Sequence, residues 1–341
     1  MRRGLVLAAA LAVVAGVAWG NAGRQRNAAP QVLRVAGAVS DLSADGARVA
    51  FHIRSGRCQR VRIWTPGHGV ASIKPDCTHQ ATVQQLTLAG TRALWVDYDF
   101  GNHAYCALMT ATLARPRPVE LPECDPSDAD RELHGLAGDG SLFAFNSWYD
   151  CSAPGATCPP GRVVYDVELW RVLNGKLTKI GASERTVTSV DSGRILLGPD
   201  PIVGLDSTGK ELWNWLFHGH SLLAAKLQGR QVVASVPCGF SKRSCGFVAY
   251  KTPSGAPGPT RNVPRDASLR DFQDGIAAYL SRGSAHVLRM GDGRDRAFRA
   301  PGGRPILDAE LERPGLFYSY NVRSGAWRGR IAFVSFAGLF R

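Results

Sequence analysis

The stretch "VSDLSADGARVAFHI", Val39 to Ile53, places an Asp-Gly turn between two segments in which apolar and polar residues alternate. This pattern predicts a β-hairpin, because Gly46 can adopt the positive φ angle that a tight turn requires. The same sequence of strand, glycine turn and strand recurs along the chain. The turn glycines of the seven hairpins are Gly46, Gly90, Gly140, Gly193, Gly229, Gly275 and Gly315.

The seven turns recur roughly every 45 residues, which leaves room for four short strands in each repeat. A second turn, between the third and fourth strands, is visible in six repeats, at residues 65–69, 114–118, 173–176, 207–210, 253–256 and 291–294. The seventh repeat stops after its third strand, at residues 330–336. The segment at residues 31–37, "QVLRVAG", precedes the first hairpin and can supply the missing strand.

Over residues 31–336 the chain therefore resembles the seven-bladed β-propeller superfamily, which includes the WD-repeat, TolB-like and quinoprotein-like groups. The resemblance implies an all-β fold of seven four-stranded antiparallel blades, closed by pairing of the N-terminal strand with the last blade. The Gly-His and Trp-Asp signature of WD repeats is absent. The architecture is thus expected without assignment to a particular family.

One segment, "VGLDSTGKELWNWLF" at residues 203–217, is similar to a quinoprotein repeat through its Thr-Gly turn and Trp213. A quinone enzyme would repeat this motif around its ring, but here it occurs once. In that family the glycine makes an outer turn and the tryptophan wedges between blades. We therefore interpret the segment as the third and fourth strands of the fourth blade.

The N-terminus predicts export. Residues 1–20 combine a short basic start with an apolar run and small residues before the end, as in a secretory signal peptide. A short linker at residues 21–30 and a single propeller domain at residues 31–341 would follow. We expect a secreted, extracellular or cell-envelope-associated protein, in contact with a membrane only if the N-terminal segment is retained. The formal net charge of +13 suits adhesion to anionic surfaces, while no basic cluster interleaved with aromatic residues indicates nucleic-acid binding.

The eight cysteines suit disulfide formation in an exported chain. Two of them fall in each of the first, second, third and fifth repeats. Pairing within repeats predicts the disulfides Cys58–Cys77, Cys106–Cys124, Cys151–Cys158 and Cys238–Cys245. All four would lie on one face of the disc, which carries the connections between second and third strands and the links between blades. We call this the loop face; the opposite face, with the glycine turns, is the turn face.

No strong catalytic motif is present, and no Ser, His and Asp constellation can be assembled from the sequence. His218 and His220 lie in one link between blades, with His103 two blades away as a weak third metal ligand. The acidic stretch at residues 123–130 lacks the spacing of a calcium loop. We therefore expect no metal ion and no cofactor.

The loop face is rich in aromatic and charged residues, the types enriched at binding hot spots. The sequence therefore favours a monomeric binding or scaffold module for an extracellular or cell-envelope protein or glycan with anionic character. The alternative is a propeller enzyme, a lyase, hydrolase or quinone-dependent oxidoreductase, with its site at the central channel. The candidate binding residues are Tyr98, Asp99, His103, Trp148, Tyr149, Asp150, His218, His220, Lys242, Arg243, Arg323 and Trp327.

Overall fold

A computed structural model describes residues 30–56, 58–74, 82–99, 105–121, 131–150, 164–198, 201–216, 222–236 and 245–340 of the chain. For residues 99, 105, 106, 131, 132, 149, 150 and 164–167 it describes the backbone alone. The predicted signal peptide and linker lie outside these ranges. Among the described residues, no helix has both the length and the apolar character needed to cross a membrane.

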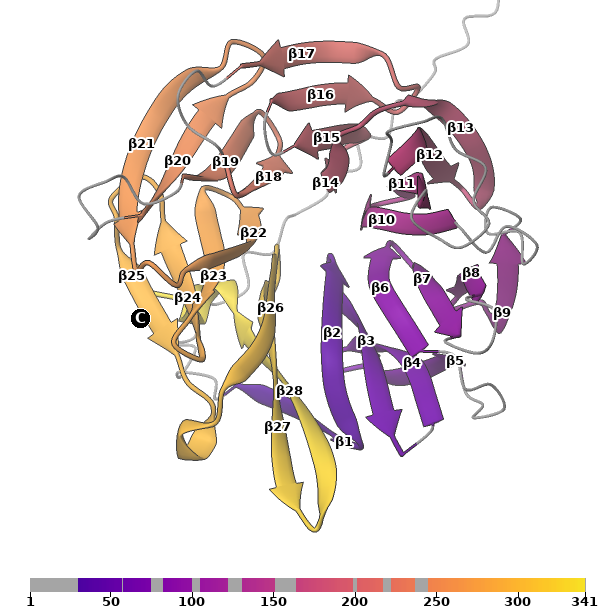
Figure 1. Cartoon of the computed structure of the whole chain (residues 1–341). Coiled ribbons are helices and arrows are strands. Elements are labelled where there is room, and N and C mark those ends of the chain that lie inside the picture. The colour runs from indigo at the N-terminus through magenta and orange to yellow at the C-terminus, as the bar shows by residue number, and fades with distance from the viewer. Residues whose placement is uncertain are drawn as a thin grey trace, which may run out of the picture.

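The described strands form seven four-stranded antiparallel sheets arranged in a ring, which is a seven-bladed β-propeller (Figure 1). Blade 1 contains β2 (Ala38–Asp45), β3 (Arg48–Ser55), β4 (Cys58–Thr65) and β5 (Gly69–Lys74). Blade 2 contains β6 (Thr82–Ala89), β7 (Arg92–Asp99), β8 (Tyr105–Thr112) and β9 (Arg115–Leu121). Blade 3 contains β10 (Arg131–Asp139), β11 (Leu142–Asp150), β12 (Val164–Leu173) and β13 (Lys176–Ala182). Blade 4 contains β14 (Thr186–Asp191), β15 (Arg194–Gly198), β16 (Ile202–Asp206) and β17 (Glu211–Trp215).

Blade 5 contains β18 (Ala224–Gln228), β19 (Gln231–Val236), β20 (Cys245–Lys251) and β21 (Ala256–Val263). Blade 6 contains β22 (Ser268–Gln273), β23 (Ile276–Ser281), β24 (Ser284–Arg289) and β25 (Asp295–Phe298). Blade 7 contains β26 (Ile306–Glu312), β27 (Gly315–Ser324), β28 (Ala326–Ser335) and β1 (Gln31–Ala36). Two single-turn 3₁₀ helices, Pro301–Gly303 and Phe336–Gly338, complete the described elements.

The predicted closure of the ring is confirmed. β1 pairs antiparallel with β28, with Val32 opposite Ala332 and Arg34 opposite Arg330. The two ends of the propeller domain therefore share one sheet, so that blade 7 has its full complement of strands. In Figure 1 the N-terminal strand, drawn in indigo, lies in the yellow blade.

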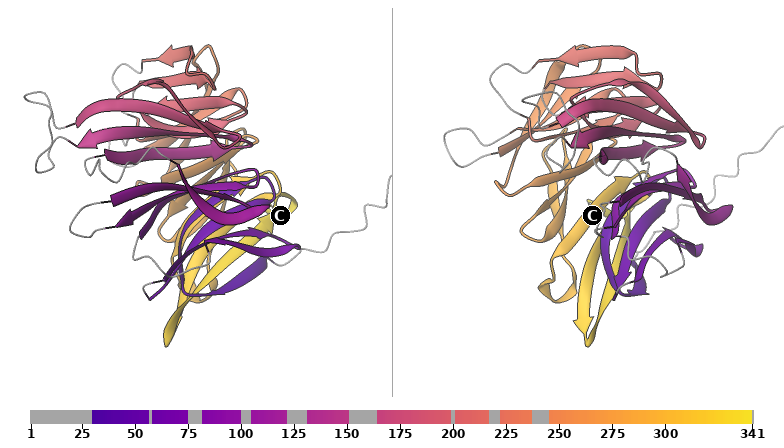
Figure 2. Two further views of the ribbon diagram at one scale, coloured as in Figure 1. Left: turned by 90° about the vertical axis from the view of Figure 1, so that its right-hand side faces the viewer. Right: turned by 45° about the vertical axis from the view of Figure 1, so that its right-hand side comes forward.

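The hydrophobic core is divided among the seven junctions between adjacent blades, which lie face to face in the disc (Figure 2). The alternation of apolar and polar residues gives each blade apolar side chains on the faces that meet its neighbours. At the junction of blades 7 and 1, for example, Phe51 and Trp64 pack against Phe317, and the Trp64 and Phe317 ring centroids are 6.2 Å apart. Each blade thus buries its two faces only against its neighbours.

A hydrogen bond between adjacent blades also recurs near the channel axis. The innermost strand of a blade is a sheet edge, so some of its N–H groups have no strand partner. Among the described residues, a side chain of the preceding blade accepts such an N–H at six of the seven junctions. The pairs, acceptor first, are Asp308 and Leu42, Ser43 and Leu88, Gln85 and Leu136, Asn146 and Val187, Ser189 and Leu227, and Asp271 and Leu311.

The interpretation of residues 203–217 as the outer strands of blade 4 is confirmed by β16 and β17. Asp206 Oδ1 accepts hydrogen bonds from the backbone N–H and hydroxyl of Thr208, at 2.7 and 2.6 Å, which fixes the turn. Trp213 and Trp215 stack with centroids 4.2 Å apart and pack in the core between blades 4 and 5. The Trp215 indole also donates to the carbonyl of Pro253 in blade 5 at 3.0 Å.

Asn321 offers a test of the ring closure, because its side chain bridges blade 7 to blade 1. Its Oδ1 accepts from the N–H of Val39 and its Nδ2 donates to the carbonyl of Val39, both at 2.9 Å. We expect Asn321→Ala to lower the free energy of unfolding by about 1–3 kcal/mol, since both backbone groups lose their partner. Urea denaturation monitored by tryptophan fluorescence measures the change.

Asn262→Ala is the matched control, because Asn262 is exposed on β21 and should leave stability within about 0.5 kcal/mol of the parent. Equal stability of the Asn321 and Asn262 variants would show that this bridge contributes nothing to closure.

Candidate functional site

The structure describes only part of the predicted binding surface. The side chains of Tyr98, Trp148, Arg323 and Trp327 are described. For Asp99, Tyr149 and Asp150 only the backbone is described, in β7 and β11. His103, His218, His220, Lys242 and Arg243 lie outside the described residues, and their role stays a prediction.

Two of the described aromatic candidates pack against their neighbours. Tyr98 is half-buried against the core between blades 2 and 3. Trp148 lies over His134 with ring centroids 4.3 Å apart and an interplanar angle of 33°. Both rings therefore contribute to blade packing, although both lie at the loop-face ends of their strands.

Arg323 and Trp327 lie instead near the tip of the β27–β28 hairpin, which reaches out beyond the ring in Figure 1. They are cross-strand partners, and the Arg323 guanidinium carbon is 5.9 Å from the centre of the Trp327 ring. The Trp327 side chain is 52% exposed, an unusual state for the largest apolar residue. Close to this tip, the Trp327 carbonyl accepts a hydrogen bond from Gly37 N–H at 3.1 Å, which ties the hairpin to the segment between β1 and β2.

The loop face of blade 1 holds a Ser, His and Asp cluster that the sequence did not reveal. Ser40 Oγ is 2.7 Å from His52 Nδ1 and donates to Asp41 Oδ2 at 2.8 Å. His52 Nδ1 is also 3.4 Å from Asp41 Oδ2. These residues line a cavity of about 500 Å³, between the inner strands of blades 7, 1 and 2.

This arrangement differs from a serine nucleophile. The Ser40 hydroxyl gives its single proton to Asp41, so His52 Nδ1 must be the donor in its bond to Ser40. A general base would need a free imidazole nitrogen facing the serine proton. His52 Nε2 is instead buried and finds no hydrogen-bond partner within the described part of the chain. Burial alone would raise the pKa of Asp41, but hydrogen bonds from His52 and Ser40 outweigh it and lower that pKa.

The central channel is acidic. Its described lining comes from the innermost strands of the blades and encloses a cavity of about 190 Å³ towards the turn face. Lys226 is the one cationic side chain among these lining residues. The carboxylates that line the channel cavity are Asp139, Asp191, Asp271, Glu310 and Glu312.

Burial and mutual repulsion change the protonation of these carboxylates. Burial is the main cause that raises the pKa of Glu310 well above its usual range, reinforced by Asp271 and Asp308. Burial followed by repulsion from Asp271 raises the pKa of Glu312 to about 9. Glu312 therefore holds a proton at neutral pH.

The channel carboxylates also have structural roles. Asp139 accepts the N–H of Ser192 at 2.7 Å, and Asp191 accepts the N–H of Gly229 at 2.8 Å. Among the described residues, no group of three or more His, Cys, Asp or Glu side chains could hold a metal ion. The cavity is also smaller than the roughly 300–1,000 Å³ of typical small-molecule sites. The channel carboxylates therefore take part in the contacts between adjacent blades.

The amino-acid sequence contains a pattern that indicates part of the acidic channel. In "LDAELE", residues 307–312, acidic residues alternate with Ala309 and Leu311, so the acids share one face of the strand. That face is the channel, because Ala309 and Leu311 are buried in the core between blades 6 and 7. The Ser40 and His52 contact had no such signal, since it joins side chains of two strands across a hairpin.

Comparison with known proteins adds the fold and no function. No protein-family model matches the chain, and no curated protein matches it. Among solved structures it is similar to the computationally designed Ika8 protein, with 14% sequence identity and a TM-score of 0.50 over 83% of this chain and 81% of that chain. At this identity the likeness concerns the fold alone.

Glu312 gives a pH-dependent test of the acidic channel. The folded chain keeps this proton from the ordinary pKa of 4.5 up to about 9, whereas the unfolded chain releases it near 4.5. The contribution of Glu312 to the free energy of unfolding therefore falls as pH rises through this range. We expect Glu312→Gln to raise that free energy by about 1–2 kcal/mol at pH 8 and to leave it unchanged at pH 4.

Urea melts at the two pH values measure this difference, with Glu211→Gln on exposed β17 as the control that should show no change at either pH. A Glu312 variant that loses stability at pH 8 would contradict the assignment.

Proposed function

We propose that this chain is a secreted binding or scaffold module that recognises an extracellular or cell-envelope protein or glycan through its loop face. The observation that supports it is the β27–β28 hairpin, which exposes Trp327 beside Arg323. Exposed tryptophan and arginine side chains on a fixed support are common centres of binding energy. Loops and hairpins on a rigid scaffold commonly carry recognition.

Anchoring of the hairpin favours this role. β27 and β28 pair in unbroken register from Gly315 opposite Ser335 to Ser324 opposite Ala326. β1 then pairs with β28 as far as Ala36 opposite Arg328. The tip is therefore held by three strands, so that little conformational entropy is lost when it binds a ligand.

The proposal includes export and disulfides. The signal peptide at residues 1–20 would deliver the chain to an oxidising compartment. Of the eight cysteines, Cys58 and Cys245 have described side chains. The partners proposed for Cys58 and Cys245 lie outside the described residues, so the four pairings are part of the proposal.

Peptide mapping tests these pairings. Digestion of the secreted chain without reduction should yield a linked peptide with Cys151 and Cys158 and another with Cys238 and Cys245. Detection of free thiols at these positions by alkylation would contradict the proposal.

The alternative is a propeller enzyme, and the convergence of Glu310, Glu312 and Asp271 is the observation that favours it. Titratable groups with displaced pKa values in a channel are typical of active sites. If this channel were catalytic, Glu310→Gln would abolish turnover. The binding module instead predicts that Glu310→Gln leaves ligand affinity unchanged.

Trp327 tests the binding function directly. We expect Trp327→Ala to weaken binding to anionic glycans on an array by about tenfold or more, because the exposed ring and its contact with Arg323 are lost. The array contains neutral, uronic-acid, sulfated and phosphorylated glycans, and affinity is then measured by biolayer interferometry. Arg323→Ala should give a smaller loss.

Leu212→Ala is the control, because Leu212 is 45% exposed on the outer strand β17, away from the hairpin. Adhesion through net charge alone would leave the affinities of the Trp327→Ala and Leu212→Ala variants unchanged, because neither changes the charge. Such adhesion would disappear on addition of about 0.5 M salt. Binding that neither tryptophan loss nor arginine loss affects would overturn the hairpin as the recognition element.

A further inference from the structure

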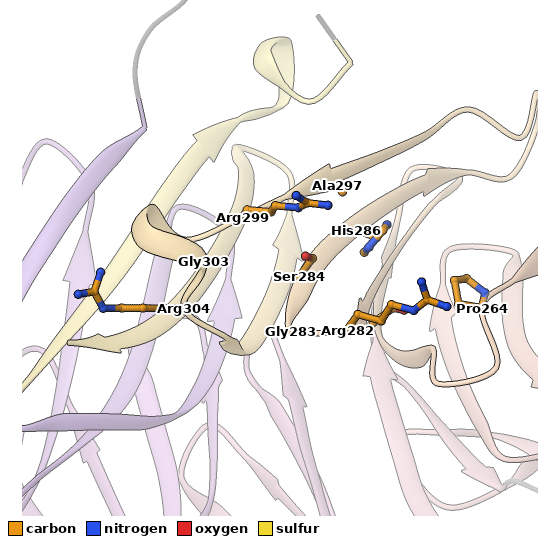
Figure 3. A pocket seen from close by; sticks show the side chains of 10 residues that line it. Pro264, Arg282, Gly283, Ser284, His286, Ala297, Arg299, Gly303 and Arg304 are labelled. Carbon is orange, nitrogen blue, oxygen red and sulfur yellow. The ribbon is translucent and has the colours of Figure 1, made fainter. Parts of the chain in front are cut away.

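Blade 6 carries a pocket on the loop face, with a volume of about 570 Å³. Its walls come from the link that precedes β22, the β23–β24 turn, the end of β25 and the 3₁₀ helix that leads to blade 7 (Figure 3). These are all loop-face elements, and all of them lie within the described residues. The pocket is therefore placed where the proposed function needs a ligand.

The lining of this pocket is basic. It contains Arg282, Arg299, Arg304 and His286, and no carboxylate. Arg304 is partly occupied, because its guanidinium donates to the carbonyl of Pro301 at 2.8 Å. The guanidinium groups of Arg282 and Arg299 have no hydrogen-bond or ion-pair partner among the described residues.

The hydroxyl of a largely buried serine adds to these donors. Ser284 is only 8% exposed, and its hydroxyl has no partner among the described residues. It precedes His286 by two positions on β24, so both side chains lie on the same side of the strand. Figure 3 shows Ser284 and His286 between the side chains of Arg299 and Arg282.

The imidazole of His286 is held in place from two sides. It stacks on Tyr279 with ring centroids 4.6 Å apart and an interplanar angle of 20°. Its Nδ1 lies 3.3 Å from Asp295 Oδ1, and Asp295 Oδ2 accepts the Tyr279 hydroxyl at 2.6 Å. Nε2 is the ring nitrogen left for a ligand.

The nearby acids are occupied outside the pocket lining. Asp266 accepts the Ser281 hydroxyl at 2.9 Å and the backbone N–H of Arg282 at 2.7 Å. Asp295 is engaged by Tyr279 and His286. Neither carboxylate lines the pocket, so an anion that enters it meets cations and hydroxyl donors.

We propose that this pocket binds the sulfate or phosphate group of an anionic polymer, an inference that deepens and rests on the proposed function. Arginine forks donate pairs of hydrogen bonds to oxyanions, and the Ser284 hydroxyl adds a donor between them. Donors from several directions match a tetrahedral oxyanion with three or four oxygens. A carboxylate offers only two oxygens and would leave some of these donors unused.

The test measures binding of dextran sulfate and of unmodified dextran to the full secreted chain by isothermal titration calorimetry. We expect dextran sulfate to bind and dextran not to bind. Arg282→Gln with Arg299→Gln should weaken dextran sulfate binding at least tenfold, and Ser284→Ala about threefold. The control pair is Arg230→Gln with Arg117→Gln, which removes the same charge from two exposed arginines. Arg230 lies in the β18–β19 turn and Arg117 on the outer strand β9, so this pair should change the affinity less than twofold.

Inorganic sulfate and inorganic phosphate separate a site for the ion from a site for the polymer. At constant ionic strength, competition of either ion with dextran sulfate, stronger than that of chloride, supports an oxyanion pocket. Competition no stronger than that of chloride overturns it. Equal losses in the pocket pair and the control pair would also overturn it, because net charge would then explain the binding.

The Arg282→Lys, Arg299→Lys variant covers the case in which the glutamine pair fails to fold. It keeps the charge but removes the paired donors, so it should still weaken sulfate binding at least threefold. Failure of the pocket is distinguishable from failure of the proposed function. If Trp327→Ala abolishes glycan binding while both pocket pairs bind normally, the loop-face function stands and the pocket inference is wrong.

Discussion

The structure depends on how the innermost strand of each blade satisfies its free edge. Seven sheet edges meet around one axis, and their inward N–H groups have no strand to pair with. A side chain from the preceding blade accepts such an N–H at most junctions of the described chain, as Asp308 does for Leu42 at 3.0 Å. The bond always runs in the same direction around the ring, including the closing junction from blade 7 to blade 1. Apolar burial holds the blades together, and these acceptors satisfy inward N–H groups that burial alone would leave without a partner.

This constraint explains why the channel is acidic. A backbone N–H needs an acceptor, and Asp271 and Asp308 supply one at two junctions. Burial raises the pKa values of Asp271 and Glu310, and the charges of Asp271 and Asp308 raise that of Glu310 further. The displaced pKa values are thus a consequence of assembly, although the same pattern is usual in active sites. The channel carboxylates therefore have an assembly role that the proposed loop-face recognition leaves unchanged.

The sequence was sufficient for the architecture because the glycine turns and strand alternation are local signals. Gly46 and its sequence neighbours are enough to predict their turn. Counting the strands of each repeat shows that the seventh repeat needs a fourth strand from the N-terminal segment. The sites were harder to predict. The acceptors at the junctions include Ser43, Gln85 and Asp271, three residue types at different distances from the following turn, so no motif marks them. The pocket of blade 6 brings together Arg282, Arg299 and Arg304 from a turn and a link. That no carboxylate lines this pocket can be seen only in three dimensions. Tyr98 shows the opposite kind of error: the sequence suggested it as a binding residue of the loop face, but its ring packs between blades.

The hairpin of blade 7 and the pocket of blade 6 belong to adjacent blades, and this arrangement affects how they would work together. The link that carries Arg304 continues directly into β26, the first strand of blade 7. Ile306 N–H also donates to the carbonyl of Gly283, in the β23–β24 turn, at 2.8 Å, and a continuous core joins the two blades. Since neither element can move far relative to the other, a polymer bound by Trp327 would keep its neighbouring charged groups at high local concentration near the pocket. Two modest contacts on such a rigid support give higher affinity than either alone, without any specific motif that a sequence comparison could detect.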